Sequence, residues 1–210
     1  MIMADKYPSF EVLAENEKRG IDYDIFTRFS GLRTTIVCPH AGGIEVGTSE
    51  LARNTALTDF NIYLFEGLKP TDNKDLHITS AKFDEPTALE IMSKSEFALS
   101  YHGFKSDEKY TIVGGSNEEL NKNLVKRLQN GGFNAVLATD RFAGADPNNI
   151  VNRTTTGIGV QLELSTTQRK AFFLNNDWSK NNRMNFTDEF RLYVAIVRDF
   201  LKYNENQNVA

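Results

Sequence analysis

The chain has 210 residues, of which 40 % are hydrophobic and 15 are Phe, and its 24 Lys+Arg against 28 Asp+Glu give a formal charge of −4. We expect one domain over 1–210, because roughly 150 residues per domain is typical and this apolar content fills a core. A single Cys excludes a disulfide framework, a multi-cysteine zinc site and an iron–sulfur cluster. The acidic balance argues against nucleic acid or an anionic membrane surface as the main partner.

No apolar stretch approaches the ~20 residues that span a bilayer, and the first residues lack a basic segment followed by an apolar one. We therefore expect a soluble protein, made in the cytoplasm without a signal peptide and without membrane contact. Release by cell lysis would leave no trace in the sequence, so action outside the cell stays open.

Segments with helix and strand patterns alternate along the chain. In order they are a short helix after Ser9, an edge strand over 21–28, a strand over 35–38, a helix over 46–57, a strand over 62–65, a helix over 86–94, a strand over 97–101, a helix over 117–130, strands over 135–138 and 159–164, and a long helix over 187–203. This alternation predicts an α/β domain whose mixed, mostly parallel sheet has helices on both faces. We expect the tail over 204–210 to fray and the long loops over 66–85 and 140–157 to carry sites.

The stretch Val113-Gly114-Gly115-Ser116 resembles a turn that binds phosphate ahead of a helix. It lacks the Lys-Ser/Thr ending of a P-loop and the three glycines of a dinucleotide site. We interpret it as the capped start of the helix over 117–130, with Ser116 or Asn117 facing Glu119.

A His and a Glu flank a glycine-rich turn in Pro39-His40-Ala41-Gly42-Gly43-Ile44-Glu45, which follows the strand ending at Cys38 and precedes a helix. Ligands bind at the carboxyl ends of strands in parallel α/β sheets, and the glycines let both side chains reach one point. The pair therefore indicates a metal site. A polar loop whose His bonds a backbone group explains the pattern equally well.

A second strand runs directly into His102-Gly103, which repeats the pattern of a His at a carboxyl end followed by Gly. Together with His40 and Glu45, His102 completes a His₂Glu set, a ligand combination of catalytic zinc that leaves a fourth position for water. The set predicts one Zn²⁺ per chain. The third histidine, His77, is expected to be a hydrogen-bonded residue rather than a fourth ligand, with contact to substrate left open.

Glu163 is unusual because it lies in a strand expected at the centre of the sheet, where a carboxylate is costly to bury unless it is paired or lines a cavity. Strand alternation places it on one face with Gln161. It either lies on a solvent-exposed face of the strand or acts as a general base that takes a proton from a zinc-activated water.

Basic residues outnumber acidic ones across 138–183 although the whole chain is acidic. This segment could therefore receive an anion. Arg141 and Arg153 are the candidates for binding substrate carboxylates, because a guanidinium offers a planar fork to a carboxylate. Solvation of loop arginines is the simpler explanation for either residue alone.

These motifs, in this order and spacing, resemble the poly-γ-glutamate hydrolases of bacteriophages and their bacterial relatives from Tyr7 to about Phe190. The segments that carry the resemblance are Pro39-His40-Ala41-Gly42-Gly43-Ile44-Glu45, Phe83-Asp84-Glu85-Pro86, His102-Gly103, Asp140-Arg141-Phe142, Asn149-Ile150-Val151-Asn152-Arg153, Gly159-Val160-Gln161-Leu162-Glu163, Gln168-Arg169 and Asp177-Trp178-Ser179-Lys180.

The resemblance implies a single α/β domain similar to a trimmed zinc carboxypeptidase core, acting as a monomer that cuts γ-linked polyglutamate internally. It also implies zinc held by His40, Glu45 and His102, with Glu163 as the catalytic carboxylate. Four residues separate the first His from the Glu here, against two in ordinary zinc carboxypeptidases. The Asn152-Arg153 pair is similar to the substrate-carboxylate clamp of those enzymes but follows the last metal ligand.

We therefore expect a zinc-dependent hydrolase that cleaves the γ-glutamyl amide bonds of an anionic polymer, poly-γ-glutamate. Two alternatives stay open. One is a zinc amidohydrolase for small acylated amino acids or cell-wall γ-glutamyl bonds, and the other is a polyglutamate-binding module without catalysis.

Overall fold

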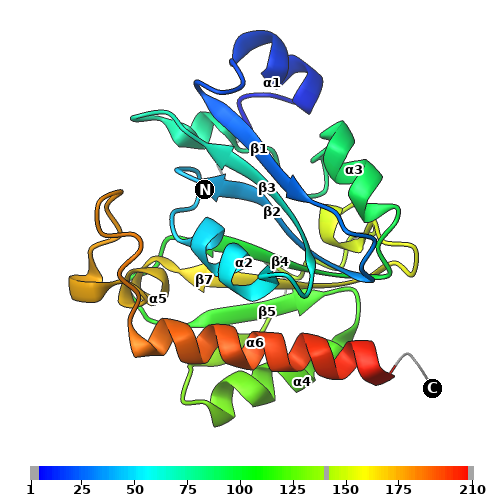
Figure 1. The fold of residues 1–210 in the computed structure, drawn as a ribbon, viewed down its shortest axis with the longest axis vertical. Helices are drawn as coiled ribbons and strands as arrows, with labels where there is room; N and C mark the ends of the chain where they lie inside the picture. Colours follow the sequence, from blue (N-terminus) through cyan, green and yellow to red (C-terminus); the bar gives the residue numbers. More distant parts are fainter. Residues whose placement is uncertain (1–4, 140–141, 208–210) are drawn as a thin grey trace.

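A seven-stranded sheet in the order β1-β3-β2-β4-β7-β5-β6 forms the centre of the computed structural model, which describes residues 5–139 and 142–207 (Figure 1). The strands are β1 (Tyr23–Arg28), β2 (Thr34–Gly42), β3 (Asn61–Gly67), β4 (Phe97–Phe104), β5 (Thr111–Gly115), β6 (Ala135–Leu137) and β7 (Ile158–Ser165). Parallel pairing joins β3, β2, β4 and β7 in succession, and also β5 with β6. Only the β1–β3 and β5–β7 pairs are antiparallel among the described strands.

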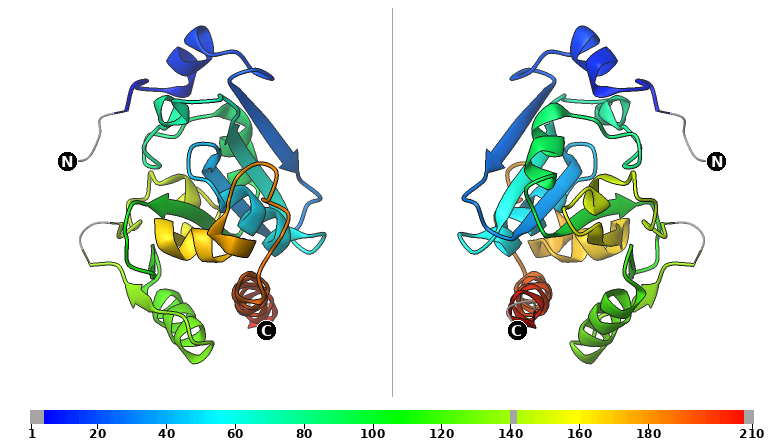
Figure 2. Two further views of the ribbon diagram at one scale, coloured as in Figure 1. Left: turned by 90° about the vertical axis from the view of Figure 1, so that its left-hand side faces the viewer. Right: turned by 90° about the vertical axis from the view of Figure 1, so that its right-hand side faces the viewer.

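Helices cover both faces of this sheet. They are α1 (Phe10–Asn16), α2 (Thr48–Ala56), α3 (Pro86–Met92), α4 (Glu118–Asn130), α5 (Thr166–Ala171) and α6 (Asp188–Gln207), with short 3₁₀ turns η1 (Asn73–Leu76), η2 (Ile150–Asn152) and η3 (Leu174–Asn176). Apolar residues of α2, α4 and α6 pack on one face, and those of α1 and α3 pack on the other. Figure 2 shows α1 at one end of the molecule and α4 with α6 at the other.

Side chains that precede the helices fix where several of them begin. The Ser9 hydroxyl accepts the Val12 N–H before α1 at 3.4 Å, and the Asn117 side chain accepts the Leu120 N–H before α4 at 3.1 Å. Such caps satisfy backbone N–H groups that have no partner inside the helix. Both caps confirm the helix starts expected from the sequence.

The expected architecture is confirmed: an α/β domain with a mixed, mostly parallel sheet and helices on both faces. The edge position of the first strand is also confirmed, because β1 pairs with β3 alone. The last helix continues to Gln207, so it includes residues 204–207 of the tail that we expected to fray. No helix within 5–139 or 142–207 is both long and apolar enough to cross a membrane.

The sequence analysis missed β5, because it interpreted Gly114 and Gly115 as a turn before a helix. Both glycines instead lie in the strand, where neighbouring backbone comes too close for a side chain. A Cβ on Gly114 would lie 2.4 Å from the Ala143 carbonyl oxygen, and one on Gly115 would lie 2.2 Å from that of Gly159. A close approach of another backbone segment, which leaves no room for a side chain, is a common reason for glycine within a strand.

Candidate metal centre

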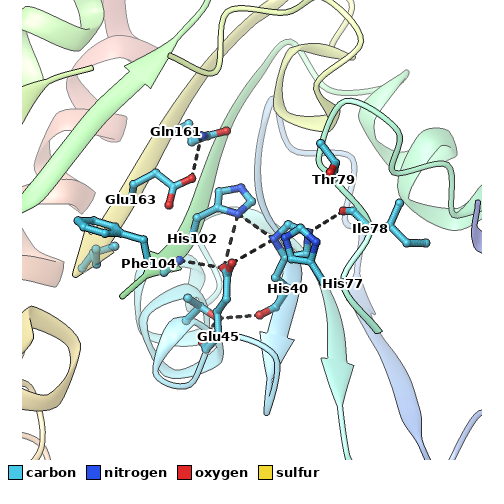
Figure 3. Close-up of polar contacts among 12 residues, drawn as sticks. His40, Glu45, His77, Ile78, Thr79, His102, Phe104, Gln161 and Glu163 are labelled. Atoms are coloured by element: carbon cyan, nitrogen blue, oxygen red, sulfur yellow. Dashed lines mark hydrogen bonds and ion pairs between the residues drawn. The ribbon is translucent and has the colours of Figure 1, made fainter. Parts of the chain in front are cut away.

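The two buried histidines, His40 in β2 and His102 in β4, lie near the carboxyl ends of adjacent parallel strands. Their Nδ1 atoms are 3.1 Å apart, and each side chain is only 2 % exposed. The Glu45 carboxylate completes the cluster, with Oε1 3.4 Å from the His40 Nδ1 and Oε2 3.6 Å from the His102 Nδ1 (Figure 3). The structure therefore brings together the three residues predicted as metal ligands.

His40 faces His102 because β2 contains a β-bulge. The register between β2 and β3 shifts by one residue between Cys38 and Ala41, and both of these side chains point into the core under α2. In a regular strand Ala41 would point to the opposite face from Cys38, so one alternation is skipped. The bulge turns His40 to the face that also carries His102, whose neighbour Tyr101 points into that same core. The strand thus continues past the end at Cys38 that the sequence indicated.

Glu45 reaches the histidines through a tight turn after β2. Its N–H donates to the His40 carbonyl at 3.0 Å, which folds the chain back. Gly42 begins this turn with φ of 65°, and a Cβ there would lie 2.6 Å from the Gly67 carbonyl oxygen, so glycine is required. The Gly103 N–H then donates to the Glu45 Oε2 at 2.8 Å and orients the carboxylate.

The proton of His40 is assigned to Nε2, because that atom lies 2.7 Å from the Ile78 carbonyl oxygen and must donate to it. Its Nδ1 therefore presents a lone pair to His102 and Glu45. Ligand histidines usually donate their other ring N–H to a carbonyl or carboxylate in this way. Burial raises the pKa of the Glu45 carboxyl, but the two histidines outweigh burial and hold that pKa well below its usual range.

The three side chains approach one another at distances close to those between the ligands of a tetrahedral zinc ion. Zn–N and Zn–O bonds of about 2.0–2.1 Å place neighbouring ligand atoms roughly 3.3 Å apart in a tetrahedron. The two Nδ1 atoms are 3.1 Å apart, and each lies 3.4–3.6 Å from a different oxygen of the Glu45 carboxylate, so all three distances are near that value. The donor set of two imidazoles and one carboxylate is also one that catalytic zinc uses.

His77 lies beside this cluster, with its ring stacked on that of His40 at a centroid distance of 3.9 Å. Its Nδ1 is 2.9 Å from the Asp5 carboxylate, which also accepts the Thr79 N–H at 2.9 Å. The pKa of His77 is lowered to about 4, because two adjacent protonated imidazoles would repel each other and because burial disfavours the charged ring, against the opposing effect of Asp5. Ligand atoms of His40, Glu45 and His77 lie within 4.8 Å of one another, so these residues form another triplet that could hold a metal.

Glu163 lies directly across from His102 in the pairing of β4 with β7. It is buried, and the Gln161 side-chain N–H donates to its Oε1 at 3.1 Å. The Asn149 amide in turn donates to the Gln161 Oε1 at 2.9 Å. Gln161 and Glu163 share one face, as strand alternation predicted, and Figure 3 shows the Glu163 carboxylate beside the His102 ring. These two amides hold the carboxylate next to the proposed ligands.

An open groove of about 540 Å³ is lined by residues of β4, β5 and β6 and of the segments that follow β4 and β6. Ile112 in β5 pairs with Glu163, and Val136 in β6 pairs with Ile112, so this row lies on one face of three neighbouring strands. Phe104, at the end of β4, and Lys105 line the groove together with both of these residues. An extended chain lying on this face would pass Glu163.

A model of the family described as poly-gamma-glutamate hydrolase matches residues 7–196. The chain belongs to the poly-γ-glutamate hydrolase family. A bacteriophage poly-γ-glutamate hydrolase has 47 % identity and a TM-score of 0.94, with 97 % of this chain and 100 % of that chain covered. The zinc-free form of YndL has 38 % identity and a TM-score of 0.90, with 95 % and 98 % covered. The SPbeta prophage-derived protein YoqZ of Bacillus subtilis (strain 168) is 42 % identical over 209 residues, with 98 % of this chain and 74 % of that protein covered.

The resemblance drawn from the motifs is thereby confirmed at the level of the family.

In this poly-γ-glutamate hydrolase family member, Arg153 is exposed at the end of η2, where its backbone N–H bonds the Ile150 carbonyl. No contact between its side chain and the histidines occurs in the described part of the chain. Arg141 lies outside the described residues. The predicted roles of both arginines in binding substrate stay predictions.

The sequence analysis of this family member included Arg169 only among the residues that carry the family resemblance and gave it no place in the metal site, whereas the structure buries it beside that site. Its side chain is 5 % exposed, and its guanidinium bonds three backbone carbonyls. Burial lowers the pKa of Arg169, while Glu45 and Glu163 act in the opposite direction. The sequence offered one signal, because Arg169 follows the strand that carries Glu163 by only a few residues.

Proposed function

We propose that this chain is a zinc-dependent hydrolase that cleaves the γ-glutamyl amide bonds of poly-γ-glutamate. One observation carries the proposal: the side chains of His40, Glu45 and His102 approach one another at 3.1–3.6 Å, and a buried carboxylate on the adjoining strand lies beside them. The family match supports the substrate, and the convergence supports hydrolysis that depends on a metal.

In this proposal His40, Glu45 and His102 hold one Zn²⁺ per chain. Zinc bound there would polarise the scissile carbonyl and allow water to act as a nucleophile near neutral pH. The Ile78 carbonyl keeps the His40 proton on Nε2, and the Gly103 N–H orients the Glu45 carboxylate, so the ligand atoms need little rearrangement.

Glu163 is proposed as the general base. Its carboxylate takes a proton from the attacking water and gives it to the nitrogen that leaves when the γ-glutamyl amide bond breaks. The hydrogen bond from Gln161 fixes one carboxylate oxygen, so the orientation of the base is set before substrate arrives.

Substrate binding is assigned to Arg141, Arg153 and His77. Poly-γ-glutamate carries a free α-carboxylate beside each linkage, and a guanidinium can pair with such a group through two hydrogen bonds. The groove includes Ile112, which pairs with Glu163, and offers room for an extended chain, and Lys105 adds a positive charge to its lining. We further propose that the protein acts as a monomer.

The decisive experiment is incubation of the purified protein with poly-γ-glutamate, followed by measurement of polymer size by gel filtration. We expect rapid shortening that a chelator abolishes and added Zn²⁺ restores. An unchanged size distribution with the zinc-loaded protein would overturn the proposal. Shortening that persists at full rate after complete metal removal would overturn the zinc requirement.

Two other functions give different results in the same assay. A zinc amidohydrolase for small acylated amino acids or cell-wall γ-glutamyl bonds would act on short substrates at least as well as on the polymer. A polyglutamate-binding module would bind the polymer without turnover. Structural zinc normally has four protein ligands, so the His₂Glu set favours an enzyme over such a module.

A further inference from the structure

The buried guanidinium of Arg169, in α5, joins three segments of the chain. Its Nη1 donates to the Val46 carbonyl at 2.7 Å, its Nε to the Leu164 carbonyl at 3.2 Å, and its Nη2 to the Phe104 carbonyl at 3.4 Å. These three hydrogen bonds are called the Arg169 bridge below. The three segments come from the turn after β2 and from the ends of β4 and β7.

Each acceptor of the bridge is next to, or two residues from, a residue of the proposed site. Val46 follows Glu45, Leu164 follows Glu163, and Phe104 comes two residues after His102. We infer that Arg169 is a positioning residue, which sets the relative placement of Glu45, His102 and Glu163 and thereby the affinity of the site for zinc. This inference deepens the proposed function, because it concerns the residues proposed to hold the metal and move the proton.

Gly103 shows how closely the guanidinium lies against the site. A Cβ on Gly103 would lie 2.3 Å from the Cζ of Arg169, so any larger residue there displaces the guanidinium. The N–H of the same Gly103 donates to the Glu45 carboxylate at 2.8 Å. The guanidinium, the Gly103 backbone and the Glu45 carboxylate are therefore packed in succession, and a shift of the first would move the third.

The chemistry of this position favours arginine over any other residue. Three carbonyls that lie in different directions need a planar group with several fixed donors, and the ammonium of Lys is a single point at the end of a flexible stem. Trp178 covers the guanidinium, with its ring 5.3 Å from Cζ.

The test compares Arg169→Gln and Arg169→Lys with the matched control Lys170→Gln. Lys170 also lies over the Trp178 ring, at 5.1 Å, so the control removes a neighbouring positive charge and leaves the bridge intact. Zinc affinity is measured by competition with a chromogenic chelator, together with the melting temperature of each metal-free protein. We expect both Arg169 variants to bind zinc about 10–100-fold more weakly and the control to stay within about twofold.

A metal-free measurement supplies an independent readout. Amide hydrogen exchange of the zinc-free proteins should be faster over 45–48 and 103–106 in the Arg169 variants and unchanged there in the control. A role in stability alone predicts a lower melting temperature with unaltered zinc affinity and no local change in exchange. That pattern, or zinc affinities within about twofold of the parent for both folded Arg169 variants, would overturn the inference.

Gly103→Ala tests the bridge with every charge retained. Gly103 has no left-handed backbone conformation, so the added methyl acts through its clash with the guanidinium. We expect Gly103→Ala to weaken zinc binding in the parent protein. In the Arg169→Gln variant, where no guanidinium occupies the space beside residue 103, the same substitution should weaken zinc binding by less than about a further twofold. Equal losses on both backgrounds would overturn the inference. Failure of the proposed function is distinguishable, because it appears in the parent as absent zinc binding or uncleaved polymer.

Discussion

The His40 and His102 rings face each other Nδ1 to Nδ1 at 3.1 Å, although a regular register of β2 would place them on opposite faces of the sheet. The bulge that corrects this contains Pro39, and proline is confined to edges, strand ends and bulges because it has no N–H to donate. Two ring nitrogens this close need a proton or a cation between them. The His40 proton is on Nε2, so either the His102 ring proton or a metal ion occupies the space between the two Nδ1 atoms.

The first prediction separates the two triplets that could hold the metal. His40→Ala and His102→Ala should each abolish zinc binding, because each removes one of three closely spaced ligand atoms. His77→Ala should retain one zinc per chain, because His77 already bonds Asp5. Elemental analysis of the purified variants checks both statements. Zinc retained by His102→Ala and lost by His77→Ala would assign the metal to His40, Glu45 and His77 instead.

The clustering of the proposed ligands was predictable because each follows a strand signal with a glycine nearby, and parallel neighbours bring such positions to one edge of a sheet. Glu163 was predictable for a different reason, since a carboxylate inside an apolar strand needs a partner or a cavity. The regular alternation of side chains along a strand did not predict that His40 faces His102, because a one-residue bulge moves every later side chain to the opposite face of the sheet. Pro39 was the available sign of that bulge.

Long-range contacts account for the rest of what sequence analysis missed. Asp5 is hydrogen-bonded to His77 and Thr79, which lie more than seventy residues away in the sequence, and Arg169 is hydrogen-bonded to Val46, which lies 123 residues away. Neither contact has a local pattern, because hydrogen bonds between loops depend on where the sheet places them. β5 was missed because its two glycines resemble a turn, whereas their close packing against Ala143 and Gly159 appears only in the folded chain.

The second prediction concerns Asp5, whose side chain is 7 % exposed and which anchors the segment that carries Ile78. Burial raises the pKa of Asp5, but the hydrogen bonds from Thr79 and His77 outweigh burial, so the pKa lies below its ordinary value of 3.8. Its contribution to stability is therefore present above that value and is lost as pH falls through the lower pKa of the folded protein. Asp5→Asn should cost about 1–3 kcal/mol in free energy of unfolding at pH 7.

Chemical denaturation at several pH values checks this prediction, with Asp75→Asn as the control. Asp75 also pairs with the N-terminal segment, through Lys6, but its side chain is 39 % exposed, so its loss should cost clearly less than the loss of Asp5. The difference between the parent and Asp5→Asn should shrink as pH falls below 3.8. If the difference in free energy of unfolding between the two proteins stays constant across that pH range, the ionised form of Asp5 contributes nothing to stability.

The third prediction concerns substrate binding by Arg141 and Arg153. Arg141→Ala and Arg153→Ala should each raise KM for the polymer while zinc content and melting temperature stay unchanged, because Arg153 is exposed and no ligand depends on it. Salt should raise KM in the parent, since charges are screened over about 8 Å at 0.15 M ionic strength. Steady-state kinetics at two salt concentrations measures both effects. If neither substitution changes KM, the two arginines do not bind the substrate carboxylates, and Lys105 in the groove becomes the next candidate.

The fourth prediction concerns Glu163, which lies across from His102 and accepts a hydrogen bond from Gln161. Glu163→Gln preserves size and can still accept that bond through its amide oxygen, but it cannot take a proton from water. Zinc and substrate should remain bound. Loss of a general base costs about 10²–10⁴-fold in rate, so kcat per zinc-loaded molecule should fall by that factor with little change in KM.

Glu50→Gln is the matched control, because Glu50 is another largely buried carboxylate and lies in α2 outside the proposed ligand set. Burial raises the pKa of Glu50, so an uncharged amide resembles the form that burial favours. This control should retain kcat within about threefold, whereas Glu163→Gln should not. A structural role for Glu163 predicts a different result, namely a lower melting temperature with normal kcat in the fraction that stays folded. Rapid-quench measurement of a single turnover separates chemistry from product release, and a chemical step within about threefold of the parent in Glu163→Gln would exclude Glu163 as the general base.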